Sequence, residues 1–470
     1  MSDTREQLET KLAEMGQQHL LAFWDECSDS EKKALSEQIK KLNSKRLRQF
    51  KKLINEQADS ATLTGEMTPL PVVRLPETPE QKKQQDQYKK TGETALKNGR
   101  VAAVLVAGGQ GSRLGFHHPK GMFPVGPVTR RTLFQYHTEK TRALEQKYNT
   151  TIPFYIMTSH ANDQETRSFY NENNCFGKSE DTIHFFKQNM LPAMDAEGKL
   201  LLKNKHELFT SPDGHGGTIN ALYQNGLFDD MAQNGIEYLF YFQVDNALVQ
   251  ICDPVYIGAH IQNQADMSAK TIYKRSWDEK LGIPVKRNGK NVVVEYSELS
   301  EADKKATTKD GTWVYGQGSI AIHVFDVKFL KTLVQTDKEL PFHLAHKKIE
   351  YIQPDGTRVK PDKPNAYKFE QFIFDAMPEA DQVMIMETDR SREFSPIKNK
   401  KGQDSPETAR QDISEYYAEW LEQAGVSGLR DENGDLLCRV EISPLFALTA
   451  DELKEKLPVN YKPMGDIVLD

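Results

Sequence analysis

Four short apolar runs divide the middle of the chain. Residues 101–107, 153–159, 238–245 and 318–325 read VAAVLVA, PFYIMTS, YLFYFQVD and GSIAIHVF, with little alternation of apolar and polar positions. Such runs are typical of strands in a sheet that is covered on both faces. Segments with helical patterns lie between them, at 131–148, 162–173 and 218–235. This order predicts an α/β fold with a parallel sheet and right-handed crossovers.

Residues 1–60 show a different pattern, in which leucines recur at helical spacings. Ser28 precedes Glu31 by three residues, as in a capping box, and predicts a helix start. Residues 61–82 are rich in proline and predict an extended connection, and residues 83–98 predict a further helix. No catalytic constellation is visible in this region, which we interpret as structural or as a docking region.

Turn-forming residues organise the rest of the chain. Glycine and aspartate around 286–312 predict a β-rich insertion, and the polar stretch after Lys398 predicts a linker or loop. From residue 410 a helix, a turn and short strands predict a small appended domain. The predicted domains are a helical N-terminal region at 1–98, a catalytic domain at 99–392 and a small α/β domain at 393–470.

Composition narrows the class of protein. The chain has 470 residues, of which 38% are hydrophobic and 27% charged, as in a globular enzyme of two or three domains. A net charge of −7 argues against non-specific nucleic-acid binding, and no apolar run reaches the roughly 18 residues of a membrane span. The four cysteines form no CxxC pair, which argues against a zinc site or a disulfide framework and favours a cytoplasmic location.

The most distinctive stretch follows the first apolar run. Residues 107–115 read AGGQGSRLG, and Pro119, Lys120 and Gly121 come shortly after. Glycines let a backbone approach a ligand closely and direct several N–H groups at one anion. The spacing fits neither a P-loop nor a dinucleotide fingerprint. A plain strand-to-helix turn would explain the glycines, but Arg113 and Lys120 add charge that suits a polyphosphate.

Together these motifs resemble a known family. Gly-Gly-x-Gly-x-Arg-Leu-Gly followed by Pro-Lys-Gly is similar to the signature of eukaryotic-type UDP-N-acetylglucosamine pyrophosphorylases, which belong to the UDP-sugar pyrophosphorylases. The resemblance runs from about residue 100 to 400. It also rests on FFKQNMLPAM, SPDGHGGT, QVDNALVQICDP, VVVEYSELS, PDKPNAYKFEQFIFD and EFSPIKN. It implies a Rossmann-like nucleotidyltransferase domain with a mostly parallel sheet.

For several single residues, the neighbouring sequence indicates a chemical role. Asp245 ends an apolar run, where a carboxylate suits Mg²⁺, although a turn or helix-capping aspartate would look the same. Glu295 lies in the run VVVEYS, which predicts a strand, and a carboxylate among valines needs a partner, which sugar hydroxyls or a solvated face could supply. His215 lies between glycines as a ligand contact or as a satisfied loop histidine. If Phe372 and Phe374 lie in a strand, they share one face of it, where they either pack in the core or shape a sugar pocket, as the resemblance implies.

The resemblance assigns further roles to matching positions. It implies that Arg113, Lys120 and Lys398 are catalytic residues that act on phosphates, and that Asp245 holds the metal. The substrate-binding residues that we predict are Ala107, Gly108, Gly109, Gln188, Gly214, His215, Gly282, Glu295, Ser319, Lys368, Phe372 and Phe374.

The predicted function is therefore a uridylyltransferase. It would form a UDP-sugar and pyrophosphate from UTP and a sugar 1-phosphate, with N-acetylglucosamine 1-phosphate as the preferred sugar, Mg²⁺ as cofactor and no nucleic-acid or membrane partner. His215 replaces the asparagine usual in acetylhexosamine enzymes, and Gly318-Ser319-Ile320-Ala321-Ile322-His323 replaces Gly-Asn-Ile-Ala-Asn-His. A UDP-glucose or broad UDP-sugar pyrophosphorylase is one alternative, and a non-catalytic nucleotide-sugar sensor is another. The sequence does not predict the oligomeric state.

Overall fold

The computed structural model describes residues 5–57, 66–336, 338–459 and 461–470. The chain packs as two compact units, each made of discontinuous segments. The first unit comprises 1–64, 188–218 and 340–375, and the second comprises 65–187, 219–339 and 376–470. The predicted three-domain division at 98 and 392 stays a prediction.

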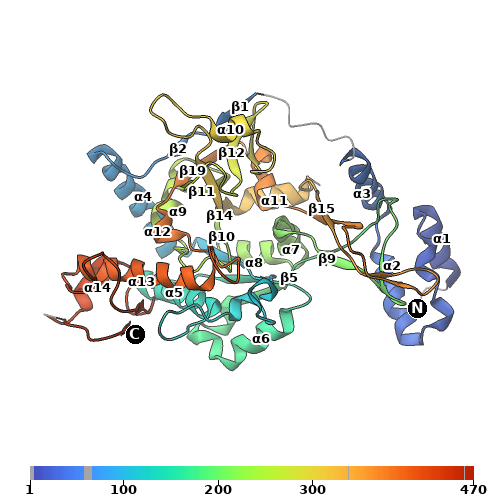
Figure 1. The fold of residues 1–470 in the computed structure, drawn as a ribbon, viewed down its shortest axis with the longest axis horizontal. Helices are drawn as coiled ribbons and strands as arrows, with labels where there is room; N and C mark the ends of the chain where they lie inside the picture. The colour runs from blue at the N-terminus through green and yellow to red at the C-terminus, as the bar shows by residue number, and fades with distance from the viewer. Residues whose placement is uncertain (1–4, 58–65, 337, 460) are drawn as a thin grey trace. The chain divides into compact units, whose positions relative to one another are not determined.

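The second unit is built on one eight-stranded sheet (Figure 1). Its order is β2 (Val72–Val73), β19 (Val383–Glu387), β11 (Met267–Tyr273), β14 (Gln317–Asp326), β10 (Tyr238–Gln243), β3 (Val101–Val106), β4 (Phe154–Thr158) and β5 (Ile183–Lys187). All neighbours are parallel except at β14, which is antiparallel to both β10 and β11. The mostly parallel sheet is confirmed, but the expectation that 318–325 runs parallel is wrong: after the insertion that follows β11, the chain returns beside β11 in the opposite direction.

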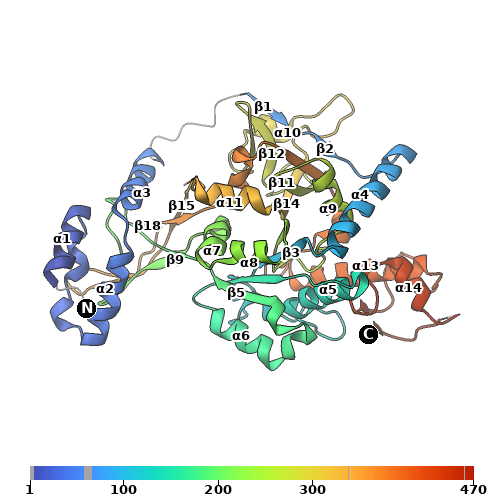
Figure 2. The same cartoon turned by 180° about the vertical axis from the view of Figure 1, so that it is seen from behind.

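Helices accompany this sheet, and those at 79–97, 133–148, 163–172 and 218–233 lie where the sequence predicted helices. The accompanying helices are α4 (Pro79–Lys97), α5 (Leu133–Tyr148), α6 (Asp163–Glu172), α7 (Thr218–Gln224), α8 (Leu227–Gln233), α9 (Pro254–Gln262), α11 (Val327–Gln335) and α12 (Arg390–Glu393). The segment predicted as one helix at 218–235 is two, because Gly226 adopts a left-handed φ of 70° between them. Helices α4 and α9 lie side by side, as Figure 2 shows, and are joined by the Gln84–Gln262 hydrogen bond.

The core of the second unit follows the apolar runs. Phe154, Phe240 and Phe242 on the strands and Phe134 on α5 are fully buried in one cluster. Large aromatic side chains inside a sheet covered by helices are the expected result of runs without polar alternation. The sheet and its flanking helices thus form the rigid frame on which the loops at the strand ends are placed.

Two smaller substructures complete the second unit. The predicted insertion is a hairpin of β12 (Ile283–Arg287) and β13 (Lys290–Val294), joined by β1 (Met67–Pro69) and followed by α10 (Glu301–Lys305). Glu295 follows β13, so its predicted place inside a strand is wrong: the chain turns at that residue. The C-terminal segment holds α13 (Pro406–Gln423), β20 (Val440–Ile442), α14 (Ala450–Lys456) and β21 (Ile467–Leu469).

The first unit joins the N-terminal helices to two later segments. Helices α1 (Arg5–Met15), α2 (Asp29–Lys41) and α3 (Ser44–Gln57) share a core with residues near 200 and 350. In that core Phe50 stacks on Phe369 with ring centroids 3.7 Å apart. The predicted capping box of Ser28 and Glu31 is confirmed. Residues 61–65 of the predicted extended connection lie outside the described residues.

The strands of the first unit are short. They are β6 (Met190–Pro192), β7 (Leu202–Asn204), β8 (Glu207–Leu208), β9 (Thr210–Pro212), β15 (His343–Lys347), β16 (Tyr351–Ile352), β17 (Arg358–Val359) and β18 (Ala366–Glu370). The 3₁₀ helices of the two units are η1 (Gln18–Leu21), η2 (Trp24–Glu26), η3 (Ser112–Leu114), η4 (Lys120–Met122), η5 (Asn174–Gly177), η6 (Glu180–Thr182), η7 (His215–Gly217) and η8 (Ile373–Glu379). In the described part of the chain, no helix has the length and apolar character that crossing a bilayer requires.

A buried ion cluster stabilises the second unit. Lys270 on β11 donates a hydrogen bond of 2.8 Å to Asp253 and another to Glu393. Its Nζ also lies 5.0 Å from the centre of the Tyr256 ring. Burial opposes the charge of Lys270, but the two carboxylates raise its pKa above the usual value.

Replacing Lys270 by methionine should lower the free energy of unfolding by about 3–5 kcal/mol, because it leaves buried carboxylates without their cation. Lys331→Met is the matched control, since its 2.9 Å pair with Asp229 is at the surface and is worth less than about 1 kcal/mol. Urea denaturation of both variants measures the difference. Equal stability of the two variants would contradict this role of Lys270.

Candidate active site

Two neighbouring strands of the sheet end at the same edge. Val106 at the end of β3 pairs with Gln243 at the end of β10, and the Val244 N–H donates 3.1 Å to the Val106 carbonyl. Ligands of open α/β sheets bind outside the carboxyl ends of strands. The loops that carry Arg113 and Asp245 therefore start side by side.

Backbone hydrogen bonds close the glycine loop on itself. The Gly111 N–H donates to His118, and the Lys120 N–H donates 3.1 Å to the Gly109 carbonyl. From outside the loop, the Asn162 side chain donates 2.9 Å to the Ala107 carbonyl. A Cβ placed on the exposed Gly109 would meet no atom within 4 Å. The packing of the chain thus does not require glycine at 109, whereas close approach of a ligand would.

The two predicted cations occupy different environments. A Cβ on Gly121 would lie 2.2 Å from the Phe134 ring, so this glycine lets η4 pack against α5 and places Lys120. The Lys120 Nζ lies 3.2 Å from Asp245 Oδ2, and both side chains are mostly buried. Arg113 in η3 is exposed. One cation is therefore paired in advance, and the other faces solvent.

The turn that carries Asp245 also holds the segment of Lys398. The Ile397 N–H donates 3.0 Å to the Asp245 carbonyl, and the Asn246 side chain bonds the backbone at both Glu393 and Ser395. Lys398 is half-buried, with its Nζ 5.5 Å from the centre of the Phe394 ring. The structure thus brings Lys120, Asp245 and the backbone of the 393–398 segment to one edge of the sheet.

Two residues that the sequence reasoning missed support this turn. On α5, His137 Nε2 lies 3.0 Å from the Val244 carbonyl, and Lys140 donates to the carbonyls of Ala247 and Val249. Burial lowers the pKa of His137 to about 3 and that of Lys140 to about 7. Their three-residue spacing places both on one helix face, but it does not distinguish them from surface residues in the sequence.

Three predicted sugar-site residues lie together near the start of β14, beside the carboxyl end of β11. The Ser319 N–H donates 2.8 Å to the Gly282 carbonyl, and a Cβ on Gly282 would lie 3.7 Å from Glu295 Oε1. Ala321 has a left-handed φ of 56° inside β14, a strained conformation for a residue with a side chain. Ile322 belongs to the buried core. Ser319 is therefore the half-buried polar residue that β14 presents next to Gly282.

The remaining predicted residues lie in the first unit. The Gln188 side chain donates 2.6 Å to the Gly214 carbonyl, and Gly214 has a φ of 85°, which side chains rarely adopt. The carboxyl group of Asp213, which the sequence reasoning passed over, interacts with the Gln188 side chain. Burial raises the pKa of its carboxyl to about 7, and its Oδ1 has no hydrogen-bond partner among the described residues. The SPDGHGGT motif contains Asp213 and could have identified it.

An aromatic stack surrounds His215. The Ile373 N–H donates 3.1 Å to His215 Nδ1, and the rings of His215 and His343 both stack on Phe372, at 5.3 and 4.3 Å. Burial lowers the pKa of His215 to about 4, so the ring is neutral at pH 7. Phe374 lies in η8, 5.2 Å from Phe372, so the expectation that both share a strand face is wrong. They meet because the chain turns into a 3₁₀ helix.

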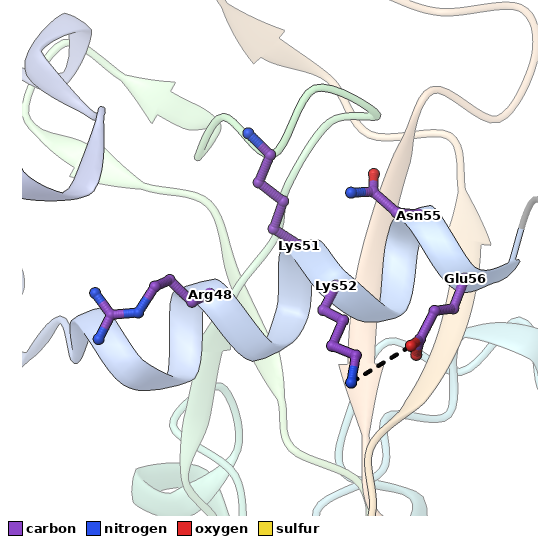
Figure 3. A pocket seen from close by; sticks show the side chains of 5 residues that line it. All are labelled: Arg48, Lys51, Lys52, Asn55 and Glu56. Atoms are coloured by element: carbon purple, nitrogen blue, oxygen red, sulfur yellow. Dashed lines mark ion pairs between the residues drawn. The ribbon is translucent and has the colours of Figure 1, made fainter.

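Two further features of the first unit are separate from this stack. Lys368 is half-buried on β18, with its Nζ 5.4 Å from the centre of the Phe209 ring. An open cavity of about 350 Å³ lies on α3, and Lys52 and Glu56 at its edge form a 3.5 Å ion pair. Its lining residues are Arg48, Lys51, Lys52, Asn55 and Glu56 (Figure 3). None of these is a residue that the sequence predicted to bind substrate.

A cationic glycine loop beside a carboxylate, at the carboxyl edge of a mostly parallel sheet, is the arrangement of α/β proteins that bind nucleotides. The chain belongs to the family described as UTP--glucose-1-phosphate uridylyltransferase, whose model matches residues 26–403. The predicted UDP-sugar pyrophosphorylase family is thus confirmed.

The names of individual relatives are more specific about the sugar than the family description is. The chain is 36% identical to UDP-N-acetylglucosamine pyrophosphorylase of Saccharomyces cerevisiae, over 90% of this chain and 92% of that protein. It is 34% identical to human UDP-N-acetylhexosamine pyrophosphorylase-like protein 1, over 96% of this chain and 94% of that protein. The solved structure of the Trypanosoma brucei uridine diphosphate N-acetylglucosamine pyrophosphorylase matches with a TM-score of 0.86 at 26% identity, over 100% and 99% of the two chains.

The buried histidine generates a prediction about pH. His215 titrates near 6.5 when unfolded and near 4 when folded, so the unfolded chain binds more protons between these values. Lowering the pH from 7 to 4 should therefore reduce the stability of the wild type by about 3 kcal/mol relative to His215→Asn. Denaturation of both proteins at several pH values measures this difference.

Asp213 provides the internal control, because its pKa is raised on folding whereas that of His215 is lowered, so the two groups change stability with pH in opposite directions. Its contribution to stability is present below its unfolded pKa of 3.8 and is lost as the pH rises toward 7. In Asp213→Asn, stability should no longer fall as the pH rises toward 7 on account of this carboxyl. A difference between His215→Asn and wild type that does not change with pH would show that His215 is not buried as a neutral ring.

Proposed function

We propose that this protein transfers the uridylyl group of UTP to a sugar 1-phosphate, with N-acetylglucosamine 1-phosphate as the preferred sugar. The observation that carries the proposal is the Lys120–Asp245 pair at 3.2 Å, with exposed Arg113 on the adjoining glycine loop. These groups offer two positive charges and one carboxylate at the sheet edge where nucleotides bind.

The proposed reaction is one in-line displacement. A phosphate oxygen of the sugar phosphate bonds to the α-phosphorus of UTP, the bond from that phosphorus to its β-bridging oxygen breaks, and pyrophosphate leaves. Arg113 and Lys120 bind the β- and γ-phosphates and stabilise the charge that develops on the leaving group. Lys398 offsets the repulsion between the nucleophile and the α-phosphate. The protein positions and neutralises, and no covalent enzyme intermediate is required.

Asp245 fits the expected Mg²⁺. Its carboxylate is mostly buried at the strand edge, and one of its oxygens is 3.2 Å from Lys120. Mg²⁺ takes few protein ligands and completes its shell with phosphate oxygens and water, so one carboxylate suffices. When bound, the ion neutralises phosphate charge. Protein groups position the Asp245 carboxylate: Lys120 orients it through their ion pair, and His137 and Lys140 on α5 hold the turn that carries it.

We propose that residues of the first unit contact the substrate, because they match substrate-binding positions of the UDP-sugar pyrophosphorylases and because their side chains have suitable chemistry. Gln188, buried beside Asp213, offers an amide that could hydrogen-bond the uracil edge. His215 presents a neutral ring, and Phe372 and Phe374 offer apolar surface. For the second unit, Glu295 and Ser319 beside Gly282 would bind sugar hydroxyls. Lys368 is proposed to contact phosphate.

Two other functions remain distinguishable. The family model is named for glucose 1-phosphate, and a histidine at 215 favours that sugar, whereas the relatives named above are N-acetylhexosamine proteins. A nucleotide-sugar sensor would have no use for cations positioned for a leaving group. Pyrophosphate release from UTP, assayed against a panel of sugar 1-phosphates, tests all three. Release with the N-acetylated sugar supports the proposal, release with glucose 1-phosphate alone supports the first alternative, and UTP binding without release supports the sensor.

Arg113→Ala should lower kcat by two or more powers of ten, on the order of 3 kcal/mol, because it removes a preorganised charge partner of the leaving pyrophosphate. Stability should hardly change, since the side chain is exposed. Steady-state kinetics and thermal unfolding measure the two effects. Arg100→Ala is the control, because Arg100 forms an ion pair with Glu237 at the opposite end of β3. Wild-type turnover in Arg113→Ala would rule out its role.

Asp245→Asn should retain the fold and lose Mg²⁺-dependent activity, because a neutral amide binds this hard cation poorly. Titration of activity with Mg²⁺ provides the measurement. The surface substitution Asp229→Asn should leave the titration unchanged. If Asp245→Asn titrated like the wild type, a different residue would have to hold the metal.

The sugar preference should be modest. N-acetyl recognition needs room for a methyl group and a polar partner for the amide, and Ser319 gives the room but only a hydroxyl. A polar mismatch is worth roughly 1–3 kcal/mol, so kcat/KM should favour N-acetylglucosamine 1-phosphate over glucose 1-phosphate by about 10 to 200. Steady-state kinetics with both sugars measure the ratio. A ratio below one would reverse the sugar assignment, and His215→Asn should then restore the N-acetyl preference.

A further inference from the structure

Three side chains of different ligand types meet in the first unit. Cys27 precedes α2, Glu31 lies in its first turn, and His206 lies in the turn between β7 and β8. The Cys27 Sγ, a Glu31 carboxylate oxygen and a His206 ring nitrogen all lie within 4.8 Å of one another. The His206 Nδ1 is 3.1 Å from Glu31 Oε1. The proposed transferase chemistry uses none of these residues.

The backbone around His206 is fixed on both sides. Its N–H donates 3.0 Å to the Asn204 side chain, and its carbonyl accepts 3.3 Å from the Gln38 amide. The same Gln38 amide accepts 2.9 Å from the Leu208 N–H, which ties the β7–β8 turn to α2. Leu35 on α2 and Leu208 on β8 are both buried in the core that these segments share. The three ligand groups are therefore brought together by the fold without any ion.

Glu31 divides its two oxygens between two tasks. Its Oε2 accepts from the backbone N–H and the hydroxyl of Ser28, both at 2.8 Å, which forms the capping box. These hydrogen bonds lower the pKa of the carboxyl, so it stays ionised. Its Oε1 faces His206. One carboxylate oxygen is thus directed at the imidazole while the other keeps the helix start in place.

Cys27 supplies a thiol that is only 7% exposed. Its Sγ lies 3.9 Å from the Lys205 carbonyl, near the outer limit for a hydrogen bond from sulfur. Burial and the nearby Glu31 charge raise the pKa of this thiol, so it is protonated at pH 7. The other charged groups around it are Glu26 and Lys205, which pair with each other, and Lys32. A buried thiol beside a carboxylate is a group that a soft cation would stabilise.

We propose that Cys27, Glu31 and His206 bind one Zn²⁺ ion, with water at the fourth position. Zinc combines thiolate, imidazole and carboxylate in a tetrahedron whose ligand atoms are on the order of 3.5 Å apart, so small side-chain rotations close the site. Cys27 loses its proton to solvent, His206 binds through a neutral ring nitrogen, and the two negative ligands balance the ion's charge. The wide spacing of the cysteines does not exclude this site, because Glu31 and His206 supply the other ligands.

The bound ion would link the N-terminal helices to the β7–β8 hairpin. Because ligands far apart in sequence come together only in the folded chain, zinc binding stabilises the folded state. The expected role is therefore structural and independent of uridylyl transfer. Because water fills the fourth position and only three ligands are protein groups, chelators should remove the ion.

Competition titration of the metal-stripped full-length chain with Zn²⁺ and a chromophoric chelator tests the site. We expect one zinc per chain with a Kd of about 1 µM or tighter, and release of about one proton per zinc from Cys27. Substitution with Co²⁺ should give thiolate-to-metal charge-transfer absorption. Failure of the wild type to bind one zinc, or a Co²⁺ complex without that absorption, would overturn the proposal.

Variants identify the ligands. Cys27→Ala and His206→Gln should each weaken zinc binding at least about 100-fold, and Glu31→Gln should weaken it while preserving the capping box, since glutamine also serves at that position. Cys438→Ser and His184→Gln are the matched controls and should bind like the wild type. If Cys27→Ala failed to fold, the partly exposed His206 would decide the question. Unchanged binding in His206→Gln would overturn the assignment.

Discussion

The ion pair of Lys120 and Asp245 is the interaction on which the proposed chemistry depends. Each group is mostly buried, and each partner lowers the cost of burying the other. A polyphosphate with its magnesium ion would replace this pair by two new ones, in which the ammonium meets phosphate and the carboxylate meets the metal. The pair is thus neutral before substrate arrives, whereas exposed Arg113 leaves the site with a net positive charge that favours a polyphosphate.

This pair is in place because of the sheet and not because of the loops alone. The register of Val106 with Gln243 aligns the ends of β3 and β10, and the buried aromatic core holds those strands. His137, Lys140 and Asn246 then hold the backbone next to Asp245 by hydrogen bonds to carbonyl and amide groups. Such supporting contacts position a charged side chain to within the small tolerance that catalysis by electrostatics demands.

The sequence was most informative where local pattern determines structure. The apolar runs, the Ser28 capping box and the glycine loop are all set by residues near one another, and they are found as predicted. The reversed direction of β14 was not predictable, since an apolar run has the same pattern in either direction. The turn at Phe372 was missed because alternating aromatics fit a strand and a 3₁₀ helix equally well.

Contacts between residues far apart in the sequence could not be predicted either. Nothing near Cys27 or Glu31 indicates that His206 lies against them, because only the fold joins these segments. Asp213 is similar: its motif was recognised, but burial and an unpartnered oxygen are properties of the packed chain. Residues that act by holding backbone, such as Lys140, have no signature of their own in a single sequence.

Exchange of labelled pyrophosphate into UTP tests the central claim most directly. The exchange requires the reverse of the proposed displacement, in which pyrophosphate bonds to the α-phosphorus again. Direct attack by the sugar phosphate predicts that label enters UTP, with Mg²⁺ present, only when UDP-N-acetylglucosamine is supplied or is formed from added N-acetylglucosamine 1-phosphate. Incorporation of label into UTP in the absence of any sugar substrate would reveal a covalent uridylyl-enzyme. That result, or no exchange under any condition, would contradict the account.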